Sequence, residues 1–178
     1  MHTKNHKMGH TLDTGLRAGL ILACIAYLIL GYPAYQPLPQ LTAQADAWLL
    51  NTAGIHAVSD SRYLVASFHH QDYIYELSYE CCGLILFAIY IIVIFLIPKF
   101  SYKHRAVALL FLPLIFFGNI LRIALGVMVG YHVSVDASIF FHDTFGQILI
   151  FIWIIACFLA WLKLTHNFPT EPHKVLKL

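Results

Sequence analysis

A thiol, a guanidinium and an imidazole occur in this chain at positions where they could form a nucleophilic site. Cys81 and Cys82 stand side by side in "YECCGLI", just before a hydrophobic stretch, and Arg122 lies inside a second stretch, one helical turn after Asn119. A cysteine attacks as its thiolate, and a nearby cation lowers the pKa of a thiol. Arg122 could supply that charge or bind a developing oxyanion. The imidazole of His142 could protonate a leaving amine.

Each residue also has a non-catalytic interpretation. Cys81 could fill space in the core, Arg122 could extend to the membrane interface, and His142 could be interfacial, beside Asp143 at a helix start. An arginine inside an apolar span is nevertheless a functional-site candidate, because its charge is unfavourable in lipid. We therefore favour the catalytic interpretation.

The composition is that of a membrane protein. Of the 178 residues, 60% are hydrophobic and 11% are charged, whereas soluble domains carry about 25% charged residues. The net charge of +2 says little about partners. No nucleic-acid signature is present in the sequence, so we do not expect nucleic-acid binding. Four scattered cysteines, which are Cys24, Cys81, Cys82 and Cys157, do not make a disulfide framework.

Four apolar stretches could cross a bilayer, which takes about 20 residues per helix. We predict one all-α polytopic membrane domain over residues 1–178, with spans at 16–33, 81–97, 106–131 and 145–164. The intervening segments are 34–80, 98–105 and 132–144, and the tails are 1–15 and 165–178.

Positive charges set the orientation of the spans. The 11 Lys and Arg residues divide into three near the start of the first span, three around the 98–105 loop, three near or after the end of the last span, and the exceptions Arg62 and Arg122. This pattern predicts that both termini are cytoplasmic and that 34–80 and 132–144 are extracytoplasmic.

The long outer segment has its own pattern. Five apolar residues recur at near-helical spacing and predict a helix on the membrane surface: Leu41, Ala45, Trp48, Leu49 and Ala53. The β-rich runs "RYLVASF" and "YIYELSY" flank "HHQD" and predict a small β-hairpin. An irregular cap over the helices is the alternative.

Helix geometry places the candidate residues at one depth. With a rise of about 1.5 Å per residue, Cys81 and Arg122 each lie about 24 Å from the inner end of their span, and His142 about 30 Å from the inner end of the last. The hydrocarbon core is about 30 Å thick. We therefore expect the three side chains to meet just below the outer surface.

These motifs resemble those of the exosortase/archaeosortase family of membrane cysteine transpeptidases. "ECCGL", "NILR" and "FHDTFG" occur in the family's order, within a resemblance that covers roughly residues 40–160. The resemblance implies that Cys81 is the nucleophile, since a small residue and then Gly83 follow it, and that Arg122 and His142 are catalytic. Asn119 belongs to the Asn-x-x-Arg motif and is expected, like Gly83, to support the site. Cys82 departs from the family pattern, because a small polar residue such as serine is usual there.

The resemblance also implies a substrate class. Family substrates are exported proteins with a C-terminal signal made of a short motif, a transmembrane helix and a basic cluster. The expected reaction is cleavage of that signal at the outer face of the cytoplasmic membrane, through a thioester, with transfer to an acceptor on a lipid or glycan. We expect no cofactor and no metal, and the hairpin could bind the recognition motif.

Three other functions compete with this interpretation. A membrane thiol-disulfide oxidoreductase would use Cys81 and Cys82 as its redox pair, although a disulfide between neighbours is strained. A metal site on both thiols and His142 would place the cation close to Arg122, which would repel it. A non-enzymatic membrane assembly protein would tolerate the loss of all these side chains.

Overall fold

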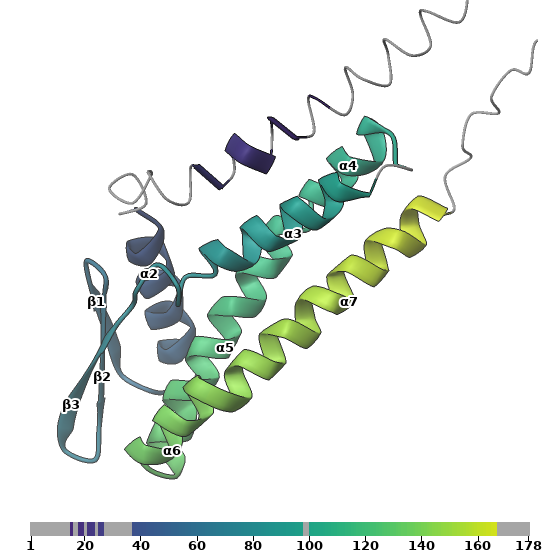
Figure 1. The fold of residues 1–178 in the computed structure, drawn as a ribbon. Coiled ribbons are helices and arrows are strands. Elements are labelled where there is room, and N and C mark those ends of the chain that lie inside the picture. Colours follow the sequence, from purple (N-terminus) through teal and green to yellow (C-terminus); the bar gives the residue numbers. More distant parts are fainter. Residues whose placement is uncertain are drawn as a thin grey trace, which may run out of the picture.

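The computed structural model describes residues 37–97 and 100–166, together with residues 15, 18–19, 21–23 and 25–26, which are helical (Figure 1). The predicted first span, both tails and Cys24 lie wholly or largely outside the described residues. The elements follow in the order α2 Pro37–Thr52, β1 Ala57–Asp60, β2 Tyr63–Phe68, β3 Gln71–Glu76, α3 Leu84–Leu96, α4 Tyr102–Leu109, α5 Leu112–His132, α6 Val135–Phe140, the π-helical segment η2 Phe141–Phe145 and α7 Gly146–His166.

Two helical stretches in the described residues are long and apolar enough to cross a membrane. They are Tyr102–His132, which joins α4 to α5, and Val135–Thr165, which joins α6, η2 and α7. α3 is apolar but has only 13 residues, fewer than the roughly 20 that a span takes. Large apolar side chains stay exposed along α5 and α7, among them Phe117, Phe151 and Leu159. Helices that are apolar on all sides are typical of membrane spans. The total of four spans stays a prediction.

The predicted outer loop at 132–144 is wrong, because most of it is helical. Only Val133 and Ser134 separate α5 from α6. The Ser134 hydroxyl accepts a hydrogen bond of 3.1 Å from the Ala137 N–H and so caps α6. The polar residues of this segment therefore start and extend a helix rather than interrupt it, and His142 lies within it.

The segment predicted to be extracytoplasmic contains, in its described residues, three antiparallel strands in the order β1-β2-β3, one more than the predicted hairpin. β2 pairs with β3 from Tyr63↔Glu76 to Phe68↔Gln71. His69 and His70 form the two-residue turn with φ of 53° and 64°, the backbone of a tight hairpin turn. β1 has four residues and reads "AVSD", which is too short and polar for the strand pattern to detect.

α2 packs on the protein through small residues. Its buried face contains Thr42, Ala43, Asp46, Ala47 and Leu50. The predicted apolar stripe faces away, since Leu41 is 52% exposed and Trp48 is 69% exposed. Contact of that stripe with the membrane surface stays a prediction.

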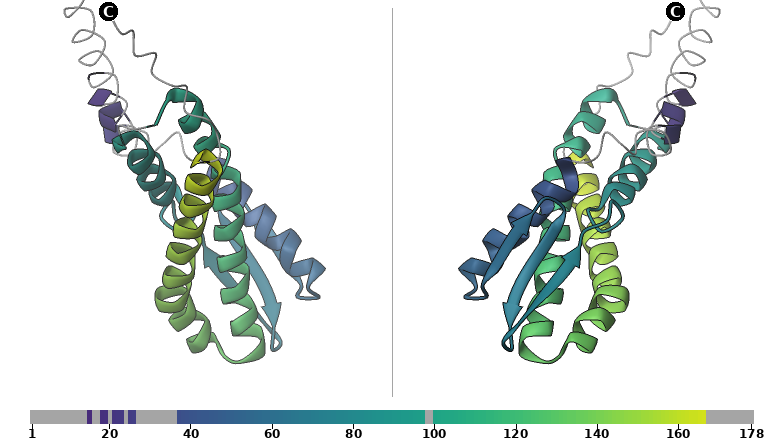
Figure 2. Two further views of the ribbon diagram at one scale, coloured as in Figure 1. Left: turned by 90° about the vertical axis from the view of Figure 1, so that its right-hand side faces the viewer. Right: turned by 90° about the vertical axis from the view of Figure 1, so that its left-hand side faces the viewer.

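The buried apolar residues form two separate hydrophobic cores. One joins α2, the sheet and the second half of α5, and includes Leu50, Leu64, Cys82, Ile123 and Val127. The other joins α3, α4, the first half of α5 and the second half of α7, and includes Tyr90, Ile94, Ala108, Ile115 and Trp161. α4 and α6 lie at opposite ends of the bundle, with the sheet beside α5 (Figures 1 and 2). The candidate residues come from elements that meet where the sheet contacts the bundle.

Candidate active site

A tight turn between β3 and α3 presents Cys81. The N–H groups of Cys82 and Gly83 donate to the carbonyls of Ser78 and Glu80, at 3.1 and 3.3 Å. Gly83 has a φ of 78°, and a Cβ atom there would lie 3.4 Å from Asn119 Cγ. The left-handed backbone favours glycine, whereas the Cβ atom would meet Asn119 only at ordinary van der Waals distance. α3 consequently begins at Leu84 rather than at the predicted Cys81, and Cys81 lies outside the helix.

Two buried side chains of α5 hold the backbone of this turn. Asn119 Nδ2 donates to the Cys81 carbonyl at 2.7 Å, and Arg122 Nη2 donates to the same oxygen at 3.3 Å. Asn119 is 1% exposed and Arg122 is 4% exposed. The interior arginine therefore donates to the main chain of the candidate nucleophile, and its charge also acts on the Cys81 thiol.

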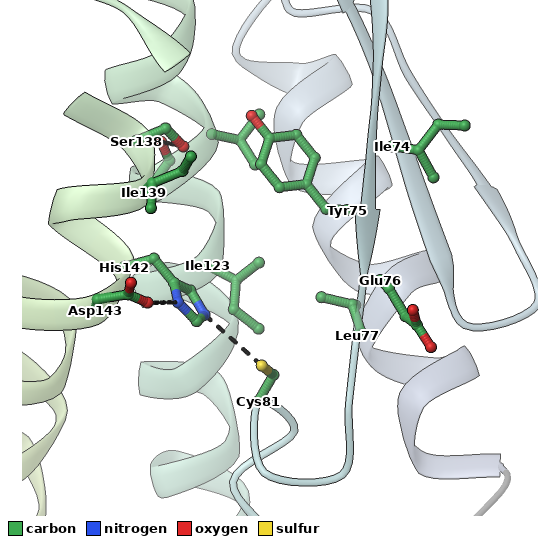
Figure 3. A pocket seen from close by; sticks show the side chains of 12 residues that line it. Ile74, Tyr75, Glu76, Leu77, Cys81, Ile123, Ser138, Ile139, His142 and Asp143 are labelled. Carbon is green, nitrogen blue, oxygen red and sulfur yellow. Dashed lines mark hydrogen bonds and ion pairs between the residues drawn. The ribbon is translucent and has the colours of Figure 1, made fainter. Parts of the chain in front are cut away.

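The Cys81 thiol faces His142. Cys81 Sγ lies 3.7 Å from His142 Nε2, and the Ser78 hydroxyl donates to the same sulfur at 3.3 Å. Figure 3 shows the imidazole between the thiol and Asp143, whose Oδ1 lies 3.1 Å from His142 Nδ1. This is the order of nucleophile, base and orienting group that cysteine catalysis uses.

The surroundings of Cys81 favour its thiolate. Its pKa is lowered from the ordinary 9.0 to about 7, mainly by the hydrogen bond with His142; burial opposes this, and Ser78 adds to it. A thiol with a pKa of about 7 is partly ionised at neutral pH, as reactive cysteines are.

The neighbouring thiol has the opposite character. Cys82 is fully buried in the core between α2, the sheet and α5. Burial is the main cause that raises the pKa of Cys82 to about 11. Cys82 therefore stays protonated at neutral pH, and both cysteines are free thiols. Only Cys81 has the character of a nucleophile, which argues against a redox pair of the two neighbours.

His142 occupies a π-helical turn. Phe141–Phe145 forms η2 between α6 and α7, and such wide turns within α-helices often occur at functional sites. Because α6, η2 and α7 are continuous, the histidine is carried on a rigid span. The sequence placed His142 at the correct end of the last span but did not detect the π-helical turn.

Sequence reasoning missed two residues of this region. Ser78 contacts the thiol, and the signal for it was its position three residues before Cys81. Asp46 on α2 is fully buried, and neither of its carboxylate oxygens has a hydrogen-bond partner among the described residues. Burial raises the pKa of Asp46 to about 8, although the charge of Arg122 opposes this. The sequence signal for Asp46 was its spacing of four residues from both Thr42 and Leu50. This spacing places it on the same helix face as the small residues of α2.

A cavity of about 310 Å³ opens beside the thiol. Cys81 and His142 line it, together with residues of β3, α5 and α6 (Figure 3). Arg122 is not among the lining residues. Across the part of the chain that the structure describes, no three His, Cys, Asp or Glu side chains gather in a way that could hold a metal ion.

The fold and the site define a class: a mostly helical membrane protein with a cysteine and a histidine facing each other where a small sheet meets the bundle. Residues 10–161 match the family model described as transmembrane exosortase. Because this match covers well over half of the chain, the protein belongs to the transmembrane exosortase family, and the resemblance seen in the sequence is confirmed. Neither the curated proteins nor the solved structures gave a match.

Proposed function

We propose that this protein is a membrane cysteine transpeptidase that cleaves the C-terminal sorting signal of exported proteins at the outer face of the cytoplasmic membrane. The observation that carries the proposal is the 3.7 Å contact between Cys81 Sγ and His142 Nε2 at the edge of a cavity. Family membership supports a transpeptidase role. Substrates are membrane-anchored through a signal of motif, transmembrane helix and basic tail, so enzyme and substrate share the bilayer.

The first step is attack on the scissile peptide bond. The Cys81 thiol first passes its proton to His142, 3.7 Å away. The thiolate then adds to the carbonyl carbon, and the carbonyl oxygen takes up the negative charge. His142 then gives a proton to the nitrogen as the carbon–nitrogen bond breaks. The products of this half-reaction are a thioester on Cys81 and a free amine on the departing signal helix.

The second step resolves the thioester. An amine or hydroxyl of a lipid or glycan acceptor gives its proton to His142 and attacks the thioester carbon, which releases the Cys81 thiolate. Arg122 and Asn119 keep the turn in place throughout, since both hold the Cys81 carbonyl. The guanidinium also places a positive charge behind the site, where it favours the anionic states of the reaction.

The oxidoreductase alternative receives no support from the geometry. Dithiol exchange needs both sulfurs to be accessible, and Cys82 is fully buried. No observation on the described residues favours a purely structural role over the paired thiol and imidazole.

Trapping the thioester tests the proposal. The purified protein would be incubated with an exported protein that carries a motif–helix–basic tail at its C-terminus. We expect an acyl adduct on Cys81, found by mass spectrometry and released by hydroxylamine. Cys81→Ala should abolish the adduct and Cys82→Ser should retain it. An adduct on Cys82, or cleavage that persists in Cys81→Ala, would overturn the assignment.

A further inference from the structure

The strand β3 has an open edge within the described part of the chain, because it pairs with β2 alone. The Leu77 N–H donates to the Arg62 carbonyl at 3.0 Å, on the β2 side. Backbone groups of successive residues point to opposite sides of an antiparallel strand. Tyr75 therefore also faces β2, and the N–H and C=O groups of Ile74 and Glu76 point toward the open edge.

The cavity beside the thiol runs along that edge. Four successive residues line it, which are Ile74, Tyr75, Glu76 and Leu77. Side chains of a strand alternate between its two faces, and Figure 3 shows Tyr75 and Leu77 pointing toward the helices while Ile74 and Glu76 point away. A cavity that touches all four must therefore follow the backbone edge.

The far wall of the cavity is apolar and belongs to the bundle. Ile123 and Val127 of α5 and Ile139 of α6 line it, and Cys81 and His142 lie in the same cavity. The cavity is thus bounded on one side by backbone groups of β3 that have no strand partner in the described part of the chain. Apolar side chains and the candidate nucleophile bound its other sides. A volume of about 310 Å³ is at the small end of binding sites and suits a few residues of extended chain.

We propose that the recognition motif of the substrate binds as an added β-strand on the open edge of β3. Its backbone pairs with Ile74 and Glu76, and alternate side chains contact the apolar wall formed by Ile123, Val127 and Ile139. This inference rests on the proposed function and specifies its substrate as an extended peptide read largely through its main chain. Strand addition of this kind obtains affinity from backbone hydrogen bonds and specificity from alternate side chains.

The test on the enzyme uses proline to remove one outward N–H group. Ile74→Pro deletes a donor on the open edge and keeps the bonds to β2, since edge strands accept proline there. Ile74→Ala keeps the donor and is the matched comparison. Asp72→Pro removes an outward N–H group from the same edge, outside the cavity lining. Because it also removes the hydrogen bond from the Ser67 hydroxyl, it gives an upper limit for the effect of a proline on the fold.

The probes are a library of capped tetrapeptide chloromethyl ketones and the small reagent iodoacetamide. Both alkylate Cys81, but only the peptide reagents can occupy the strand site. The measured quantity is the ratio of the two rate constants at Cys81, determined by mass spectrometry with the fastest peptide of the library. We expect this ratio to fall about tenfold in Ile74→Pro relative to Ile74→Ala, the effect of a lost backbone hydrogen bond, and to keep its wild-type value in Asp72→Pro.

A second arm alters the peptide. Methylation of its backbone nitrogens one at a time should slow labelling at every second position, because only alternate N–H groups face β3. Equal ratios in Ile74→Pro and Ile74→Ala, no alternation along the peptide, or no peptide faster than a capped single-residue chloromethyl ketone would overturn the added strand. If Cys81 reacts with neither reagent class, the proposed function itself fails, so the two failures are distinct.

Discussion

Replacing His142 by alanine removes the hydrogen bond that lowers the pKa of the Cys81 thiol most strongly. Burial would then raise this pKa, opposed by Ser78 and by the positive charge of Arg122. The pKa should therefore return from about 7 to about the ordinary 9.0. Removing a hydrogen bond to the thiolate disfavours the ionised form, so the ionisation midpoint moves to higher pH.

The expected effect on rate is smaller than the effect on ionisation. At pH 7 the thiolate fraction falls from about one half to about 1%, a change of about fiftyfold. A thiolate of higher pKa is a stronger nucleophile, and two pH units recover about eightfold of the rate. Alkylation of Cys81 at pH 7 should thus slow about sixfold, while the midpoint of its pH profile moves up by about two pH units.

The assay is the rate of iodoacetamide labelling at Cys81, measured by mass spectrometry on detergent-solubilised protein from about pH 5 to 10. Ser78→Ala is the comparison variant and should raise the midpoint less, since His142 is the larger cause. A His142→Ala variant whose midpoint stays near 7 would show that the imidazole does not stabilise the thiolate, and the pairing of the two side chains in catalysis would then be refuted.

Three further predictions follow from the burial and backbone of neighbouring residues. Cys82→Ser should keep transpeptidation and the Cys81 labelling profile, because its own thiol is buried and protonated; loss of activity on that change would point to dithiol chemistry. Gly83→Ala and Gly54→Ala both place a side chain at a φ near 80°, which costs about 1 kcal/mol, and a thermal melt should show similar losses. Only Gly83→Ala should also slow Cys81 labelling, because a Cβ atom at Gly54 meets nothing within 4 Å and lies away from the site. The pKa of Asp46 is raised from 3.8 to about 8 in the fold, so the folded state holds this proton more strongly than the unfolded chain does. The stability that this group contributes is fully present below pH 3.8 and is lost as the pH rises toward 8. Asp46→Asn should therefore reduce the fall in melting temperature between pH 5 and pH 8. An unchanged fall would contradict a buried neutral carboxyl.

The buried polar residues around the turn have a common consequence. Arg122 Nε and Nη1 have no hydrogen-bond partner among the described residues, and the same holds for both oxygens of Asp46. Unpaired buried polar groups are unfavourable, and they persist where function requires them. Here the guanidinium of Arg122 places a positive charge behind the turn that carries Cys81, while burial keeps the Asp46 carboxyl neutral at pH 7. This arrangement agrees with a site that must stabilise negative charge during the reaction.

The sequence by itself determined the class of the protein, its family and the chain positions of the candidate residues. The composition identifies a membrane protein, because apolar stretches of about 20 residues are long enough to cross a bilayer. The depth estimate for Cys81, Arg122 and His142 needed only the constant rise of a helix, and the structure brings these three residues to one place.

Only the tertiary structure decided which groups meet and how their surroundings act on them. The choice between Cys81 and Cys82 depends on which side of the turn faces the cavity, and that is set by the left-handed Gly83 and by Asn119 from another helix. The contact of Arg122 with a carbonyl, the burial of Asp46 and the open edge of β3 likewise arise from segments far apart in the chain. Hydropathy describes how each residue partitions between water and lipid, and it carries no information on which surfaces pack together.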